Sequence, residues 1–214
     1  MCFSATASFT SSAILCGAGF VAYRQVKSLN HLPFALIPFF FSAQQFAEGL
    51  VWMSFNYHGL FHWRMPAAYF YLLTAQFFWP IFFPFSIWKM EDPGRRKKIL
   101  FALLLIGIII GVYLGYRVSS LPFLIIESKR HLVYVTAPNN SWFFKNVSLY
   151  AIATLIPPFV SSLRGMPAFG SFIVTSLALS MLFFPESVIS IWCYFAAILS
   201  LIVILILRKP VVDS

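Results

Sequence analysis

Hydrophobic residues fall into seven long runs along the chain, separated by connections that hold most of the charged residues. Each run approaches the roughly 20 apolar residues that a helix needs to cross about 30 Å of hydrocarbon. The pattern predicts an all-α bundle of seven transmembrane helices, which forms a single integral membrane domain over residues 1–214. The runs are residues 5–23, 32–55, 66–88, 99–116, 147–163, 168–184 and 188–207.

The fifth and sixth runs are the shortest, and only a few residues around Arg164 and Gly165 separate them. Two interpretations follow from this closeness. Either both runs cross the membrane, or the pair forms a re-entrant hairpin and leaves five complete spans. The two ends of the chain keep the same orientation in both cases.

The distribution of basic residues orients the bundle. Arg24 and Lys27 follow the first run and no Lys or Arg precedes it, which is the reverse of a secretory signal peptide. With seven spans, ten of the 15 Lys and Arg residues lie on the same side as the basic run 95–98. The other five are Arg64, Arg117, Lys129, Arg130 and Lys145. Because Lys and Arg concentrate in cytoplasmic loops, this predicts an outside N-terminus and a cytoplasmic C-terminus.

Composition agrees with a chain surrounded by the lipid bilayer. Hydrophobic residues make up 60% of it and charged residues only 10%, against about 25% charged residues in soluble domains. Short basic runs between the spans account for the net charge of +9, so nucleic acid is not expected as a partner. His58 and His62 lie four residues apart, but zinc sites use three or four ligands, so no metal is predicted. The sequence identifies no cofactor.

Glu48 stands out because it is a carboxylate inside the otherwise uncharged apolar run 32–55. An ionisable side chain at membrane depth costs about 2.5–3.5 kcal/mol on insertion scales and usually faces a protein interior or a water-filled cavity. Gln44, Gln45 and Trp52 lie three or four residues from it, which predicts one angular sector of the helix. The sequence therefore predicts a polar stripe toward the outer half of the membrane.

Other runs bring polar residues to the same depth. Gln76 comes shortly before Trp79, which a proline follows, and proline leaves a backbone carbonyl to face neighbours or a cavity. Trp192 and Cys193 open the last run, and Cys2 precedes the first. Two interpretations stay open: an interhelical hydrogen-bond cluster that fixes packing, or a site for a ligand, an ion or a proton. A disulfide between Cys2 and Cys193 also stays open.

The long connection, residues 117–146, is predicted to lie outside. Residues 132–136 are rich in β-formers and residues 137–140 carry a turn signal, so we expect a small hairpin or cap over the outer end of the bundle. Connections of this length in compact proteins are commonly functional lids or disordered. The apolar stretch 121–126 argues against free exposure to water.

Three glycines form a small-residue face on the fourth helix. Gly107, Gly111 and Gly115 recur every four residues, which permits close approach of another helix. The partner is either a helix of the same chain or a second protomer. In the second case the protein would be a homo-oligomer.

Three stretches carry a family resemblance. They are the opening Met-Cys-Phe-Ser-Ala-Thr-Ala-Ser-Phe, the 32–35 entry to the second helix with its later Gln-Gln and Glu-Gly pairs, and the 190–197 string Ser-Ile-Trp-Cys-Tyr-Phe-Ala-Ala. They resemble an uncharacterised family of small bacterial multi-pass membrane proteins that begin Met-Cys-Phe-Ser-Ala. The resemblance spans most of the chain and implies a bacterial inner-membrane location. The residues that match recurrent motifs are Cys2, Gln44, Gln45, Glu48, Trp192 and Cys193.

These features favour a membrane protein that binds or translocates a small or lipidic molecule, an ion or a proton through an outer-facing pocket centred on Glu48. Amides would orient the ligand and indole rings would form the walls. The amides are Gln44, Gln45 and Gln76, and the walls are Trp52, Trp79 and Trp192. One alternative is a structural or accessory subunit that docks through the glycine face. Another is an enzyme that uses Cys2 as nucleophile and Glu48 as its base.

Overall fold

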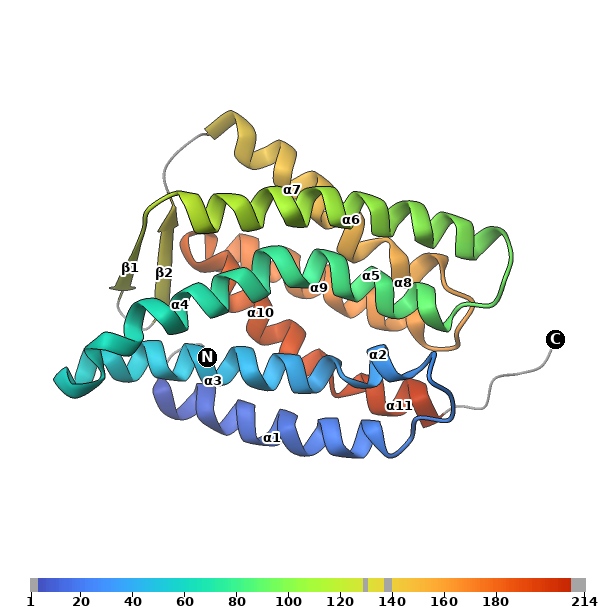
Figure 1. The fold of residues 1–214 in the computed structure, drawn as a ribbon, viewed down its shortest axis with the longest axis horizontal. Coiled ribbons are helices and arrows are strands. Elements are labelled where there is room, and N and C mark those ends of the chain that lie inside the picture. The colour runs from blue at the N-terminus through green and yellow to red at the C-terminus, as the bar shows by residue number, and fades with distance from the viewer. Residues whose placement is uncertain (1–3, 129–130, 137–139, 209–214) are drawn as a thin grey trace.

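The computed structural model describes residues 4–128, 131–136 and 140–208, which fold into an elongated bundle of helices (Figure 1). The first half contains α1 (Ala5–Tyr23), α2 (Leu32–Ala35), α3 (Ile37–Asn56), η1 (His58–Trp63), α4 (Arg64–Leu73), η2 (Thr74–Phe78), α5 (Trp79–Met90) and α6 (Arg95–Ser120). Two strands follow, β1 (Phe123–Ser128) and β2 (His131–Thr136). The second half contains α7 (Asn140–Leu155), α8 (Pro157–Val160), α9 (Met166–Phe183), η3 (Pro185–Ser187), α10 (Val188–Leu199) and α11 (Ile202–Arg208).

Six helical stretches among the described residues are long and apolar enough to cross a membrane. They are Ala5–Tyr23, Leu32–Asn56, His58–Met90, Arg95–Ser120, Met166–Phe183 and Pro185–Arg208. The predicted all-α class and the presence of several membrane-length helices are confirmed. The fifth predicted run lies in α7 and α8, of which the apolar part Ser148–Val160 is shorter than these six stretches.

Prolines explain the interruptions in two of the predicted helices. The third run passes through a π-helical turn, η2, just before Pro80, whose nitrogen has no hydrogen to donate to the preceding turn. The carbonyl of Ala75 in this turn accepts a hydrogen bond from the Tyr150 hydroxyl on α7 at 2.8 Å instead. Pro157 and Pro158 likewise separate α7 from α8.

The glycine face of α6 packs inside the chain. A Cβ atom on Gly107 would lie 1.9 Å from the Pro80 carbonyl oxygen, and one on Gly111 would lie 2.9 Å from the Phe77 carbonyl oxygen. A Cβ atom on Gly115 would lie 3.1 Å from the Phe77 Cβ atom. Of the two predicted partners for this face, the structure shows the internal one, formed by η2 and α5.

An antiparallel hairpin of β1 and β2 lies across one end of the bundle (Figure 1). The predicted hairpin is therefore confirmed, but the chain reverses between Ser128 and His131, which pair with each other, and not after residue 136 as the turn signal indicated. Leu132 and Tyr134 are buried against the helices, whereas Leu124 on the other face is exposed. Residues 137–139 lie outside the described part of the chain.

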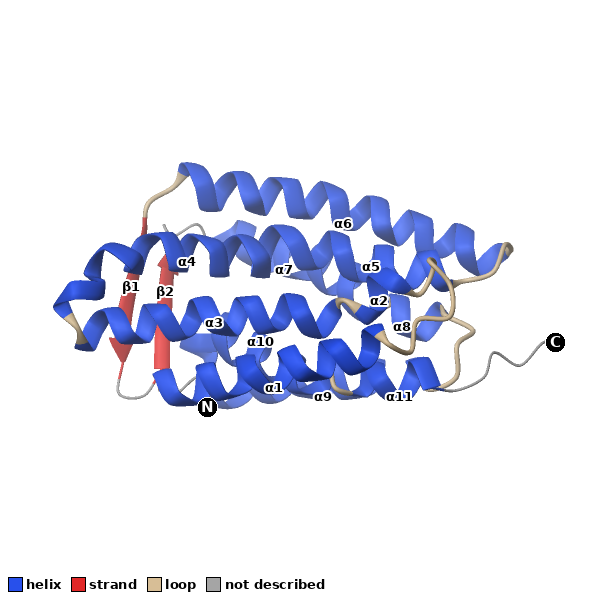
Figure 2. Ribbon diagram, turned by 60° about the horizontal axis from the view of Figure 1, so that its bottom comes forward, coloured by secondary structure: helices blue, strands red, loops and turns tan. Residues whose placement is uncertain are grey.

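Short connections join the helices at the opposite end (Figure 2). Glu91, which is 4% exposed, accepts hydrogen bonds there from Ser161 Oγ at 2.9 Å and from the Ser162 backbone nitrogen at 3.0 Å. These bonds hold the end of α8 beside the end of α5. Because α7 follows the hairpin, α7 and α8 together run from the hairpin end to this opposite end.

Candidate functional site

Helix α3 carries its polar side chains on two neighbouring stripes. Gln44 and Glu48 face α5 and α10, whereas Ser42, Gln45 and Gly49 face α1. Consecutive positions on a helix are about 100° apart, so the structure divides the predicted single sector between two faces. Gln44, Gln45 and Glu48 are all fully buried.

The first stripe joins three helices through two buried hydrogen bonds. Ser190 Oγ on α10 donates to Glu48 Oε1 at 2.5 Å, and Trp79 Nε1 on α5 donates to Gln44 Oε1 at 2.7 Å. The Trp79 ring also stacks on Phe41, with centroids 4.0 Å apart and planes 22° apart. These contacts hold Glu48 and Gln44 at the junction of α3, α5 and α10.

The second stripe packs closely on α1. Ser42 Oγ donates to the Ser12 carbonyl at 2.8 Å, and Ser12 Oγ donates to the Ser42 carbonyl at 2.9 Å. One turn beyond Gln45, the missing side chain of Gly49 leaves room for the Phe9 ring, since a Cβ atom there would lie 2.8 Å from it. Gln45 lies between these positions, and neither its Nε2 nor its Oε1 atom has a hydrogen-bond partner among the described residues.

Four further buried polar atoms on these helices have no hydrogen-bond partner among the described residues. They are Ser8 Oγ, Gln44 Nε2, Trp52 Nε1 and Trp192 Nε1. With the two amide atoms of Gln45 they make six. A buried polar group without a partner costs about 1–3 kcal/mol, and native proteins hold few of them. This concentration of buried donors and acceptors makes the region the candidate site.

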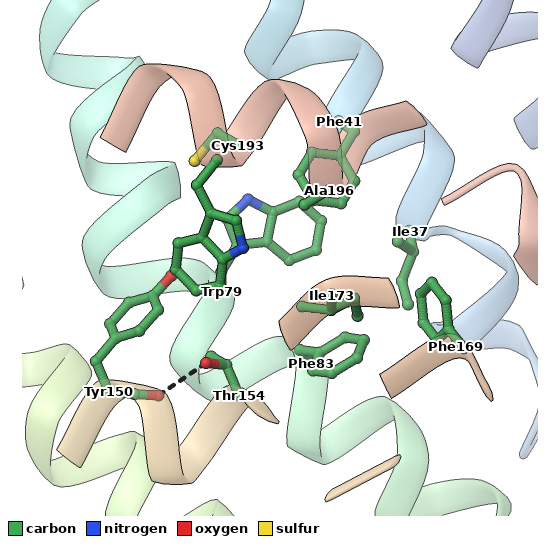
Figure 3. A pocket seen from close by; sticks show the side chains of 11 residues that line it. Ile37, Phe41, Trp79, Phe83, Tyr150, Thr154, Phe169, Ile173, Cys193 and Ala196 are labelled. Carbon is green, nitrogen blue, oxygen red and sulfur yellow. Dashed lines mark hydrogen bonds between the residues drawn. The ribbon is translucent and has the colours of Figure 1, made fainter. Parts of the chain in front are cut away.

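A cavity of about 50 Å³ adjoins the first stripe between α5, α7, α9 and α10 (Figure 3). Its walls are mostly aromatic and aliphatic, with polar atoms from Tyr150, Trp192 and Cys193 among them. A single water needs about 10–15 Å³, so the cavity has room for a few waters or one small solute. Cys193 connects the cavity to the first stripe, because it lines the cavity and its thiol lies close to Gln44 and Glu48.

The hairpin of β1 and β2 covers the site at one end of the bundle. Tyr134 of β2 stacks on Tyr71 of α4, with centroids 5.3 Å apart and planes 13° apart. Leu132 packs in the same buried cluster as Trp52 and Cys193. The end of the bundle at which the sequence placed an outer-facing pocket is therefore covered by the strands.

The structure brings five of the predicted site residues together. They are Gln44, Glu48, Trp79, Trp192 and Cys193. Gln45 is buried on the neighbouring stripe, and Trp52 packs toward the hairpin and not into the cavity. Gln76 is only half-buried in η2, and none of the described hydrogen bonds joins it to Glu48. Cys2 lies outside the described residues.

Sequence reasoning missed three residues of the site: Ser190, Tyr150 and Tyr71. Helical spacing could have found Ser190, because it lies one turn before Cys193 and shares its face. The two tyrosines carry no such signal, since tyrosine is common near membrane interfaces for reasons unrelated to a site.

The described residues contain no group of three or more His, Cys, Asp or Glu side chains that could hold a metal ion. His58 and His62 are both exposed on η1. Cys16 and Cys193 carry free thiols, and Cys193 is buried.

Comparison with known proteins identifies a family but no activity. No curated protein and no solved structure matches the chain. A family profile covers almost its full length, which confirms the expected membership of an uncharacterised family. The chain belongs to DUF6629, a family of unknown function, whose profile matches residues 1–213.

Proposed function

We propose that the chain is an integral membrane protein that binds a small hydrogen-bonding solute, or carries a proton, at the buried Glu48 site. Glu48 is the group that exchanges the proton. The observation that carries this proposal is the full burial of Glu48, Gln44 and Gln45 inside an apolar bundle, where six buried polar atoms, three of them from the two glutamines, have no hydrogen-bond partner among the described residues. Polar and ionisable groups at membrane depth are costly and usually mark functional sites.

The hydrogen bonds support a distinct role for each residue. Ser190 and Trp79 hold one oxygen of Glu48 and one of Gln44, so both side chains keep a fixed orientation. Trp192 Nε1 on the cavity wall, and Gln44 Nε2 beside the cavity residue Cys193, then serve as donors. A solute with acceptor oxygens, or a short chain of waters, would accept hydrogen bonds from them.

The size of the cavity narrows the class of ligand. Sites for drug-sized molecules measure about 300–1,000 Å³. A cavity of about 50 Å³ instead favours a solute of a few heavy atoms over a lipid. The predicted lipidic ligand is therefore not proposed for this site.

We place the protein in a bacterial inner membrane with seven crossings. Asn140–Leu155 and Pro157–Val160, with the residue between them, comprise 21 residues, or about 31 Å at 1.5 Å per residue. This matches the roughly 30 Å hydrocarbon thickness, so the broken α7–α8 segment serves as the seventh crossing beside the six longer ones. An odd number of crossings puts the two ends on opposite sides. The basic run 95–98 then places the C-terminus in the cytoplasm.

The two alternatives gain no specific support. The accessory-subunit proposal relied on the glycine face of α6, which packs against Pro80 and Phe77 of the same chain. The enzyme proposal relied on Cys2, which lies outside the described residues.

Thermal stability of the purified protein in nanodiscs, measured across pH, tests the proposal. Glu48→Gln keeps the shape of the side chain but cannot exchange a proton. We expect the stability difference between wild type and Glu48→Gln to change with pH. Glu186→Gln makes the same change at an exposed position and should follow wild type. A Glu48→Gln difference that stays constant across pH would reject the proposal.

A further inference from the structure

A second and larger recess lies on the surface of the bundle, between α1, α3 and α4. This α1–α4 groove has a volume of about 570 Å³, and its lining includes Ser12, Ala43, Leu50 and Phe70. We infer that it binds one acyl chain of an anionic phospholipid, whose phosphate lies beside Arg64. The inference rests on the membrane placement proposed above, but not on the role of Glu48.

The lining of the groove is chemically suited to hydrocarbon. Its two serines, Ser12 and Ser42, donate to each other's backbone carbonyls, so their hydroxyl groups need no partner from the groove. Phe46 and Phe70 are about half exposed, at 51% and 48%. At membrane depth the surroundings of such side chains are acyl chains, and water is excluded.

The length of the groove matches a single leaflet. Along α3 its lining extends from Phe39 to Leu50, and the 11 helical steps between these residues measure about 16 Å at 1.5 Å per step. Half of the hydrocarbon core is about 15 Å thick. A single chain from one leaflet therefore fills the groove from end to end.

A fixed cation lies at the end of the groove beyond Leu50. Ser54 continues this row of α3 by one turn, and its Oγ and carbonyl oxygen accept hydrogen bonds from Arg64 Nε at 3.0 Å and Arg64 Nη2 at 2.6 Å. The guanidinium group also lies 3.8 Å above the centre of the Phe55 ring. None of these contacts involves a carboxylate, so the positive charge remains available to a phosphate. Trp63 beside it is 49% exposed and is a residue type typical of the head-group level.

Native mass spectrometry of the full chain in detergent, titrated with phosphatidylglycerol or with phosphatidylcholine of the same acyl chains, tests this inference. Ala43→Phe places a ring on the lining of the groove, whereas Ala102→Phe makes the same change at an exposed position on α6 outside the groove. We expect Ala43→Phe to lose most of the bound phosphatidylglycerol and Ala102→Phe to retain it. If Ala43→Phe does not fold, Ala43→Leu takes its place with a smaller expected loss.

The head-group contact is tested in the same titration. We expect wild type to prefer phosphatidylglycerol over phosphatidylcholine by roughly five-fold, Arg64→Gln to lose this preference, and Arg64→Lys to keep most of it. Glu48→Gln should bind the lipid as wild type does, which separates this inference from the proposed function. Equal lipid binding by the Ala43 and Ala102 variants, or no head-group preference in wild type, would overturn it.

Discussion

At the scale of single residues, the site combines polar atoms that have a hydrogen-bond partner with polar atoms that have none among the described residues. One oxygen of Gln44 and one of Glu48 each accept a hydrogen bond from another helix, which offsets part of the cost of burying them. Gln45 differs, because it lies between two closely packed positions, and no described residue bonds to its amide group. A leucine of similar size would pack there at lower cost, so Gln45 is a costly choice for packing alone.

His31 provides a pH prediction outside the spans. Burial, and then the charge of Lys27, lower the pKa of His31 below its ordinary value of 6.5. The unfolded state therefore binds the proton more readily, so this group lowers stability as the pH falls through about 6.5 and then through the folded-state pKa. We expect His31→Gln to flatten the acid side of the stability profile below about pH 6.5. Calorimetry in nanodiscs measures this, and identical profiles for wild type and variant would contradict it.

At the scale of helices and strands, run length predicted most of the fold. The bounds of α1, and of α2 and α3 taken together, follow their apolar runs closely, because membrane thickness fixes the length of a spanning helix. The sequence could not locate the π-helical turn η2, although Pro80 marks its end, since proline permits several local adjustments. The first hairpin strand was also missed, because its apolar run is short and carries no turn signal of its own.

The packing of α6 gives a prediction at this scale. Gly111→Leu should lower the free energy of unfolding by about 1–3 kcal/mol, because any Cβ atom there already approaches the Phe77 carbonyl oxygen. Ile109→Leu is the matched control, since Ile109 is 68% exposed on the same helix and should change stability by less than about 0.5 kcal/mol. Chemical unfolding of both variants in detergent measures the difference. Equal stability would show that the face is not tightly packed.

At the scale of the whole molecule, long-range contacts define the site. Ser190 and Glu48 are 142 positions apart, and Tyr150 and Ala75 are 75 apart. A sequence predicts which helix face is polar, but the rotation of one helix against another depends on the packing of both. Glu48, Gln44 and Cys193 could therefore be predicted from their place on apolar helices, whereas Ser190, which depends on the rotation of α10 against α3, was missed.

Topology is also a property of the whole chain. Reporter fusions at residues 139 and 214 should show opposite sidedness, with the C-terminal reporter in the cytoplasm, because ten of the 15 basic residues lie on that side of a seven-crossing bundle. A fusion in the connection that contains 95–98 should match the C-terminal one. The same sidedness at 139 and 214 would refute the seven-crossing arrangement.

We propose above that the buried Glu48 carboxyl exchanges a proton within the membrane. Infrared spectroscopy in nanodiscs measures this, because the difference spectrum between wild type and Glu48→Gln isolates the signal of this carboxyl group. Proton exchange predicts a Glu48 carboxylic-acid band whose intensity changes with pH, and which Glu186→Gln leaves in place. A Glu48 signal that stays constant from acidic to alkaline pH would rule out proton exchange at this residue.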